Sequence, residues 1–576
     1  MRPRFPVPDW ARRYDASLLG ADVMAAVIVT VMLIPQSLAY AMLAGLPPET
    51  GLYASILPLV AYAQFGSSRV LAVGPVAVVS LMTASAVAPV LEAGLASAPA
   101  AALTLAALSG AVLVGMGLLR LGFLANFLSH PVISGFITAS GLLIAAGQLR
   151  HILGVPAGGG TLPGIVAGLA EQIGAVNPAT LAVGAGVLAF LWATRCCLKR
   201  GLVGLGLSAG LAGGIVRAAP VAAIAATILA SAAFDLGARG VALVGEIPRG
   251  LPVPGLPPFA PDLVLALLPS AVLISVIGFV ESVSVAQTLA AKRRERIRPD
   301  RELFGLGAAN FAAAFTSGYP VTGGFARSVV NYEAGAQSPA AGIFTALGIA
   351  LATLFLTPWL AGLPQATLAA TIILAVLSLV DLPALRRTWR YSRPDFAAML
   401  TTILVTLGLG VEQGITAGVL LSLALYLWRT SRPHSAVVGR VPGTGHFRNI
   451  ERHQVITTPG VLALRVDESL YFANARFLED RIAALVADRP GLRHVVLMCP
   501  AVNEIDASAL ESLEEINRRL SEAGIRFHLS EVKGPVMDRL HRSTFLSHLT
   551  GEVFLSQHEA DCALAGDQPP EPQKLS

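Results

Sequence analysis

The chain is poor in charged residues, in aromatic side chains and in cysteine. Of its 576 residues only 13% are charged and 6% are aromatic, whereas 54% are hydrophobic. So little charge excludes an ordinary water-soluble protein of this length, because too few polar side chains remain to cover its surface. The mean hydropathy of +0.67 agrees with this. The sequence therefore predicts an α-helical polytopic membrane protein that has the lipid bilayer as its main environment.

The four cysteines do not form a recognisable framework. Cys196, Cys197, Cys499 and Cys562 have neither paired spacing nor the spacing of metal ligands. We therefore expect no disulfide framework and no structural zinc site.

The formal net charge of +5 comes from basic residues in short loops between apolar segments. These clusters fall at 12–13, 195–200, 292–301, 386–393 and 429–432. This distribution is typical of the cytosolic loops of a membrane protein and excludes a continuous nucleic-acid-binding face. We expect a multi-pass protein of the cell's inner membrane with both termini in the cytosol.

Composition changes along the chain divide it into five regions. We expect a cytosolic N-terminal segment at 1–20, a transmembrane domain at 21–430, a polar linker at 431–455, a soluble domain at 456–565 and a disordered tail at 566–576.

The membrane domain carries a weak internal repeat. PQSLAYAMLAG from Pro35 resembles ESVSVAQTLAA from Glu281, and GPVAVVS from Gly74 corresponds to GGFARSV from Gly323 at nearly the same displacement. We count about fourteen membrane segments, several of them too short to cross alone. Two halves of seven segments each place the second half upside down, as in many secondary transporters.

Two corresponding segments are interrupted by glycine and proline. Gly74-Pro75 precedes a short helix that we expect to end before Pro89, and GYPVTGG precedes another short helix at Phe325. Each segment predicts an extended stretch that turns into a half-helix inside the membrane. Half-helix amino ends carry unpaired N–H groups and partial positive charge, so two of them facing each other predict an anion site.

Arg327 and Glu281 are two charged residues inside apolar segments, Arg327 in the second half-helix and Glu281 in a separate apolar helix that ends at the basic cluster from Lys292. Arg327, in the first turn of the second half-helix, adds a planar fork suited to oxyanions. Glu281 lies roughly 16 Å from the nearest basic cluster along a helix, near the middle of a bilayer. A carboxylate there costs on the order of 3 kcal/mol, which favours an ion- or proton-coupling site. A buried helix contact for Glu281, and a structural Arg327–Glu281 pair, remain open alternatives.

Gln36 and Tyr40 lie four residues apart, on one face of the first apolar helix. Such a polar pair either lines a cavity or makes a hydrogen bond between helices, and the sequence leaves both open.

The quoted stretches together resemble the SulP anion transporters, the bacterial relatives of solute carrier family 26. The motifs are LIPQSLAYAMLAGLPPETGLYASILP, FGSSRVLAVGPVAVVSL, GFVESVSVAQTLA and GYPVTGGFARSVVN, and the resemblance covers about residues 15–565. It implies a uracil-transporter-like fold in which a core subdomain moves against a gate subdomain, and homodimers. It also implies an anion between Val76, Ala77, Phe325 and Ala326, with Gln36, Tyr40 and Arg327 around it and Glu281 at the family's acidic position.

One position departs from the sodium-bicarbonate branch of this family. That branch carries a hydroxyl four residues after the acid, where this chain has Val285. Hard cations prefer oxygen ligands, so the departure disfavours sodium and favours a proton, which a desolvated carboxyl group binds readily.

The C-terminal region alternates strand and helix patterns and resembles a STAS domain, a small cytosolic α/β domain. Asp506 is expected as a helix N-cap in its loop, and Ser508 keeps one hydroxyl of a pattern that is phosphorylated in anti-sigma-factor antagonists. A plain helix-start serine is the preferred interpretation of Ser508.

We therefore expect a secondary anion transporter with no enzymatic activity, cofactor or metal. The preferred mechanism is proton-coupled symport of sulfate, bicarbonate or a dicarboxylate by elevator-type alternating access. Sodium-coupled bicarbonate symport, anion exchange and an anion channel are alternatives within transport. A membrane-tethered receptor that signals through the STAS-like domain is an alternative of another class.

Overall fold

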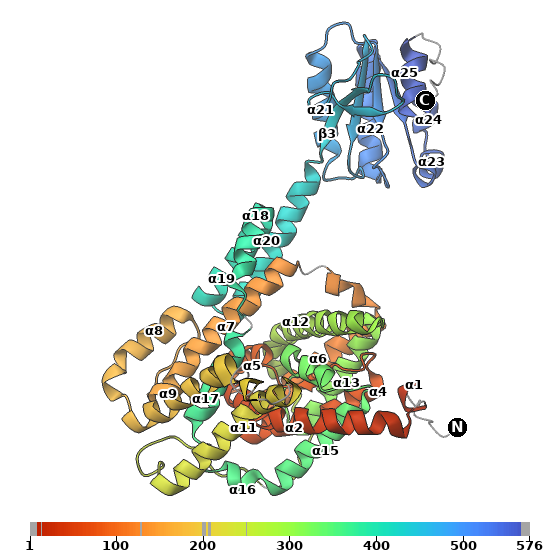
Figure 1. The fold of residues 1–576 in the computed structure, drawn as a ribbon. Helices are drawn as coiled ribbons and strands as arrows, with labels where there is room; N and C mark the ends of the chain where they lie inside the picture. The colour runs from red at the N-terminus through yellow and green to blue at the C-terminus, as the bar shows by residue number, and fades with distance from the viewer. Residues whose placement is uncertain are drawn as a thin grey trace. The chain divides into compact units, whose positions relative to one another are not determined.

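The computed structural model describes residues 9–12, 14–126, 129–198, 203–205, 209–248, 250–378 and 380–565. They fall into two compact units, Met1–Ser422 and Leu423–Ser576, whose boundary lies within helix α20 (Val411–Ser431). The first unit is almost entirely helical and the second contains a sheet (Figure 1). The predicted tail at 566–576 and the first eight residues lie outside the described part of the chain.

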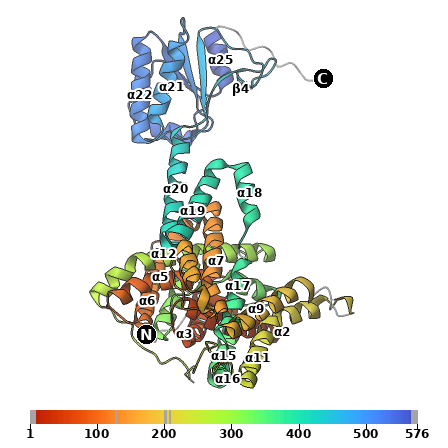
Figure 2. The same cartoon turned by 90° about the vertical axis from the view of Figure 1, so that its left-hand side faces the viewer.

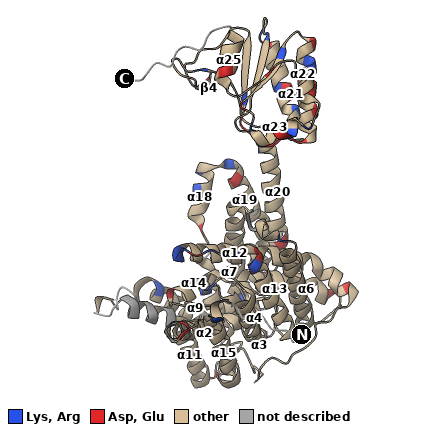
Figure 3. Cartoon of the chain, turned by 90° about the vertical axis from the view of Figure 1, so that its right-hand side faces the viewer, with Lys and Arg blue, Asp and Glu red and all other residues tan. Residues whose placement is uncertain are grey.

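Seven helical stretches in the described residues are long and apolar enough to cross a membrane. They are α2 (Ala16–Leu43), α6 (Ala98–Leu118), α7 (His130–Leu153), α9 (Pro178–Ala193) with the π-helical turn η3 (Thr194–Leu198), α12 (Pro261–Arg293), α17 (Gln365–Leu377) with α18 (Leu382–Tyr391), and α20. Charged residues are sparse along these helices and dense on the second unit (Figure 3). The predicted polytopic helical architecture is confirmed.

The remaining described elements complete the first unit. They are α1 (Asp9–Arg12), α3 (Pro48–Tyr53), α4 (Leu57–Phe65), β1 (Val73–Gly74), α5 (Ala77–Glu92), η1 (Leu121–Asn126), α8 (Leu162–Glu171), η2 (Ile173–Ala175), α11 (Ala209–Phe234), α13 (Pro299–Phe315), β2 (Thr322–Gly323), α14 (Phe325–Glu333), α15 (Ala340–Phe355), α16 (Thr357–Leu360) and α19 (Arg393–Gly408). Helix α5 continues through Pro89, which differs from the predicted end before this proline.

The helices of the first unit pack in two groups. In one, α13 packs on α6 and α4, α12 packs on α6 and α5, and α15 packs on α2 and α4. In the other, α19 and α17 pack on α7, and α17 also packs on α9. Helices α11 and α17 contact α2, so the two groups meet there.

The two short strands cross at the interruptions that the sequence predicted. Val73 pairs with Gly323 and Gly74 with Thr322 in an antiparallel register. Helices α5 and α14 start directly after these strands, so corresponding segments of the two halves enter the site in opposite directions. This is the geometry that an inverted repeat requires.

Two fully buried carboxylates hold connecting segments of the first unit. Asp22 accepts hydrogen bonds from the N–H groups of Gln337 and Ser338 and from the Ser338 hydroxyl, just before α15. Glu302 accepts from the Tyr62 hydroxyl (2.6 Å) and from N–H and O–H donors of the turn that follows α4. Such buried charges are stable only because several donors surround each one.

The second unit is a layered α/β domain with one six-stranded sheet of order β4-β3-β5-β6-β7-β8. Strands β5 to β8 are parallel, whereas β3 is antiparallel to β4 and β5. Helices α21 and α22 cover one face and α25 lies on the other (Figure 2). The elements are β3 (Ser435–Arg440), β4 (Phe447–Asn449), β5 (Val461–Val466), α21 (Ala475–Ala487), β6 (His494–Met498), α22 (Ala507–Glu522), β7 (Arg526–Ser530), α23 (Gly534–Leu540), α24 (Phe545–His548), β8 (Val553–Phe554) and α25 (Gln557–Ala565).

Residues 431–455, expected as a polar linker, contribute β3 and β4 to this sheet. The difference has a physical reason: β3 buries Ala436 and Val438 and β4 buries Phe447, too few apolar residues to stand out in the sequence. Pairing with β5 supplies the missing stabilisation. The domain fold therefore begins before residue 456.

His528 is a buried titratable group of this domain. Its side chain is 2% exposed on β7, where Nδ1 accepts a hydrogen bond from the Glu552 N–H (3.0 Å) and Nε2 faces His494 Nδ1 at 3.1 Å. Burial, together with the positive charge of neighbouring His494 and Arg526, lowers the pKa of His528 to about 4.

We expect this group to make the domain less stable in mild acid. Between about pH 6.5 and 4 the unfolded chain takes up a proton on His528 and the folded chain does not, so stability is complete above this window and falls within it. In a fragment of residues 430–565, His528→Asn should reduce this loss by roughly 1 to 3 kcal/mol, since Asn keeps an acceptor without titrating. Urea denaturation at several pH values measures the difference. The exposed His541→Asn variant is the control, and an equal slope in all three proteins would contradict the assignment.

Candidate anion-binding site

The starts of α5 and α14 lie beside each other because their preceding strands pair. The Gly324 N–H donates to the Ala72 carbonyl (3.2 Å), and a Cβ at Gly324 would lie only 2.9 Å from Val76 Cγ1. Neither helix has a side-chain N-cap, so the N-cap residues Val76 and Gly324 leave the N–H groups of the first turn without a capping side chain. Two uncapped helix starts at one place form a concentration of partial positive charge.

Polar side chains from three helices fix the two extended strands before α14 and α5. Asn310 on α13 donates to the Val321 carbonyl (2.9 Å) and accepts from the Val321 N–H (3.0 Å). Ser282 on α12 accepts from the Gly323 N–H (2.8 Å) and lies 2.7 Å from the Thr322 hydroxyl. Ser328 on α14 accepts from the Ala72 N–H (3.0 Å) and so holds the strand before α5. Both strands are thus rigidly positioned.

Arg327 extends from α14 toward the strand that precedes α5. Its side chain is 3% exposed, and a Cβ at Gly74 would lie 2.4 Å from its Nη1. This Nη1 is buried and has no hydrogen-bond partner in the described part of the chain. A buried guanidinium nitrogen without an acceptor is costly, and an anion would provide the acceptor.

Three polar groups interact electrostatically with Arg327. They belong to Tyr40, Tyr319 and Glu281, and Tyr319 also shares a hydrogen bond with Ser80 on α5 (3.1 Å). Among the described residues no ion pair within 4.0 Å joins Arg327 to Glu281, which sets aside a direct pair in this structure. The positive charge of Arg327 is therefore not cancelled by a contacting carboxylate.

Glu281 lies in apolar surroundings. It lines a small cavity with Val78, Phe136, Val280 and Ile415 among others, on helices α5, α7, α12 and α20. No hydrogen bond from another described residue reaches its carboxyl group. Since an unpaired carboxylate is costly in such surroundings, this position suits a group that gains and loses a proton.

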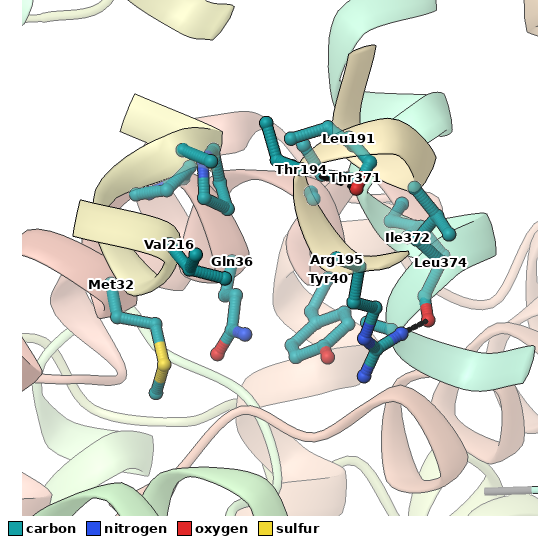
Figure 4. Close-up of a pocket in the computed structure, with 15 residues that line it drawn as sticks. Met32, Gln36, Tyr40, Leu191, Thr194, Arg195, Val216, Thr371, Ile372 and Leu374 are labelled. Atoms are coloured by element: carbon teal, nitrogen blue, oxygen red, sulfur yellow. Dashed lines mark hydrogen bonds between the residues drawn. The ribbon is translucent and has the colours of Figure 1, made fainter. Parts of the chain in front are cut away.

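Gln36 and Tyr40 line a cavity of about 270 Å³ between α2, α9, η3, α11 and α17 (Figure 4). Tyr40 is 8% exposed and packs in the same buried cluster as Ala77, the first residue of α5. This cavity therefore ends close to the helix starts. Of the two alternatives that the sequence left open, the structure shows the cavity-lining one.

The other predicted residues are placed as follows. Val76 and Ala77 are buried at the start of α5, whereas Phe325 is 47% exposed at the start of α14. The side chain of Ala326 lies outside the described residues. Val76, Ala77 and Phe325 are not among the described residues that line the cavity of Gln36 and Tyr40. In the second unit Asp506 caps α22 by accepting from the Ala509 N–H (2.8 Å), as predicted, and Ser508 is exposed on that helix.

Sequence reasoning missed the residues that position this site. Asn310 and Ser282 were single polar residues in apolar segments, and their shared target became visible only through their hydrogen bonds with Val321 and Gly323. The Thr322 hydroxyl adds a hydrogen bond to the Gly278 carbonyl of α12. Arg195 lines the cavity beside Gln36 and Tyr40, but in the sequence it was simply the first member of a basic cluster.

Substitution of Gly74 tests whether anion binding requires Arg327 to lie beside strand β1. We expect Gly74→Ala to weaken anion binding at least tenfold, because the added Cβ would meet Nη1 at 2.4 Å and displace the guanidinium. Anion-dependent thermal stabilisation of the purified protein measures binding. Gly94→Ala is the control, since that glycine also has positive φ but open space around it. Equal losses in both variants would contradict the contact.

Comparison with known proteins gives the family. The Sulfate permease family profile matches residues 19–402 and the STAS domain profile matches residues 452–560. Sulfate transporter 4.1, chloroplastic, of Arabidopsis thaliana is 36% identical over 574 residues, covering 96% of this chain and 82% of the relative. A probable sulfate transporter of Mycobacterium tuberculosis is 34% identical over 562 residues, covering 95% of this chain and 97% of the relative.

Two solved structures share the fold. SLC26A9 superposes with a TM-score of 0.87 at 22% identity and covers 97% of this chain and 92% of its own. The transmembrane domain of the cyanobacterium bicarbonate transporter BicA has a TM-score of 0.60 at 20% identity, covering 71% of this chain and 98% of its own. By its matched profiles and its relatives, this chain belongs to the sulfate permease family and carries a C-terminal STAS domain.

Proposed function

We propose that this protein is a secondary active anion transporter that carries sulfate. The observation that carries the proposal is the buried Arg327 Nη1, which lacks an acceptor between two uncapped helix starts. A tetrahedral oxyanion supplies several acceptors at once and would satisfy both the guanidinium and the N–H groups. Two relatives at 34% and 36% identity are named as sulfate transporters, which supports sulfate over bicarbonate or a dicarboxylate.

Glu281 is our candidate for the coupling group. It lies in an apolar cavity that Val78 of α5 also lines, and it interacts electrostatically with Arg327. A proton on Glu281 would offset one of the two negative charges that sulfate brings, so symport reduces the change in the site's total charge. Val285 supplies no hydroxyl for sodium, which supports the proton.

Transport would proceed by movement of one helix group against the other. The strand pair, α5 and α14 belong to the group with α2, α12, α13 and α15, so the anion would travel with that group. The cavity between α2 and the α9, α11 and α17 helices would be the path to it. Homodimer assembly and the cytosolic location of both termini stay predictions of the sequence.

Replacing Arg327 tests the anion site. We expect Arg327→Gln to weaken sulfate binding by roughly ten- to a hundredfold, since a hydrogen bond to a charged group contributes about 1.5 to 3 kcal/mol. Arg327→Lys keeps the charge but not the fork and should be intermediate. Sulfate-dependent thermal stabilisation and labelled sulfate uptake in proteoliposomes are the measurements, with the exposed Arg390→Gln as control. Normal uptake by Arg327→Gln would place the site elsewhere, and no uptake by the wild type would favour the receptor function.

Glu281→Gln tests coupling separately from binding. The amide keeps the shape of the carboxyl group but cannot exchange a proton at neutral pH. We expect sulfate binding to survive and concentrative uptake under an inward proton gradient to disappear. Uptake driven by a sodium gradient at constant pH in the wild type would overturn proton coupling.

A further inference from the structure

The cavity beside Gln36 and Tyr40 contains one charged side chain. Of the residues that line it most are apolar, such as Leu191, Val216 and Ile372, and Arg195 is the single charged residue among them. No carboxylate lines the cavity, and within the described residues no ion pair involves Arg195. Its positive charge therefore acts on the cavity without a nearby negative charge to oppose it.

A distortion of the helix directs Arg195 to this place. Helix α9 ends at Ala193 and widens into the π-helical turn Thr194–Leu198, and the Thr194 hydroxyl donates to the Leu191 carbonyl (2.8 Å). Both Thr194 and Arg195 line the cavity, whereas the exposed Cys196 and Cys197 do not. Short π-helical turns inside helices occur frequently at functional sites.

One nitrogen of Arg195 anchors the side chain. Its Nη1 donates to the Leu374 carbonyl at 3.0 Å, near the end of α17 (Figure 4). This is the hydrogen bond that the described residues make with Arg195, and it uses one of the five N–H groups of a guanidinium. The side chain is thus held in place while keeping donors for a ligand.

Arg195 and Tyr40 line the same cavity at different depths. Arg195 is exposed, whereas Tyr40 is 8% exposed and interacts electrostatically with the buried Arg327. Arg327 itself does not line the cavity. An anion that enters past Arg195 would therefore meet Gln36 and Tyr40 next and Arg327 last.

We propose that Arg195 forms a second, outer anion-binding station at the mouth of this cavity, which concentrates oxyanions before they reach Arg327. The proposal rests on the proposed function and adds a residue that sets the apparent affinity without taking part in the inner site. The ligand chemistry is a free oxyanion such as sulfate. The phosphate of an anionic lipid shares that chemistry, so the test includes vesicles with and without such lipids.

The first experiment measures the half-saturating sulfate concentration for uptake in phosphatidylcholine vesicles. At low ionic strength Arg195→Gln should raise it by roughly tenfold while the maximal rate changes little, because the station attracts the anion but does not hold it during transport. The difference should shrink at about 1 M salt, where charges are screened within about 3 Å. Arg195→Lys should lie near the wild type, and the exposed Arg386→Gln is the matched control for loss of one basic residue.

A second experiment restores the charge chemically. Arg195→Cys is made in a chain whose Cys196 and Cys197 are both replaced by serine. Reaction with an ethylammonium thiosulfonate should return the low-salt half-saturating concentration toward that of the wild type, whereas a neutral thiosulfonate of similar size should not. Loss of a purely structural contact with Leu374 would respond equally to both reagents.

The outcomes separate this proposal from the proposed function. If wild-type vesicles take up no sulfate, the proposed function fails. If they do and Arg195→Gln has the wild-type half-saturating concentration at low ionic strength, or if Arg386→Gln is affected equally, the outer station is wrong. It is also overturned if the effect of Arg195→Gln appears only in vesicles with anionic lipid, which would assign Arg195 to a lipid phosphate.

Discussion

The antiparallel crossing of Val73–Gly74 with Thr322–Gly323 is the contact on which the site depends. A strand pair this short is not stable alone, and here it is held by Asn310, Ser282 and Ser328 from the surrounding helices. Because each helix starts within three residues of the crossing, pairing the strands also brings the two amino ends together. Backbone donors and Arg327 then share one location without any flexible loop.

The residues around the strand crossing leave the positive charge of Arg327 and of the two helix starts available to bind an anion. Two fully buried carboxylates of this unit, Asp22 and Glu302, accept hydrogen bonds from backbone N–H groups and hydroxyl groups of its connecting segments. Glu281 faces an apolar cavity and makes no contacting ion pair with Arg327 in the described residues. The fold thus separates acids that hold its structure from the acid that we assign to coupling. A single proton on Glu281 can then change the electrostatics around Arg327 without breaking a structural bond.

Much of the candidate site was predictable because its residues interrupt simple patterns. A glycine and a proline at 74–75, the glycines around 323, and charged residues in apolar segments all conflict with plain membrane helices. The extended stretches and the half-helix starts that follow them were predicted from these interruptions, whereas the pairing of the two strands came from the structure. Strands β3 and β4, the continuation of α5 through Pro89 and the cavity role of Arg195 were not predictable in this way, because each depends on neighbours distant in the chain.

The sequence by itself determined the membrane class, the two-part organisation, the two half-helices, the arginine on the second of them and the acid on the separate helix α12. These follow from composition and local pattern, because the hydrocarbon core of a membrane permits few backbone conformations and makes each isolated charge costly in free energy. Only the tertiary structure decided which nitrogen of Arg327 has no partner among the described residues, that Glu281 and Arg327 make no ion pair there, and that Arg195 lines the cavity of Gln36 and Tyr40. Burial and hydrogen-bond satisfaction are set by residues hundreds of positions apart, and a single chain's pattern carries no information about those distances.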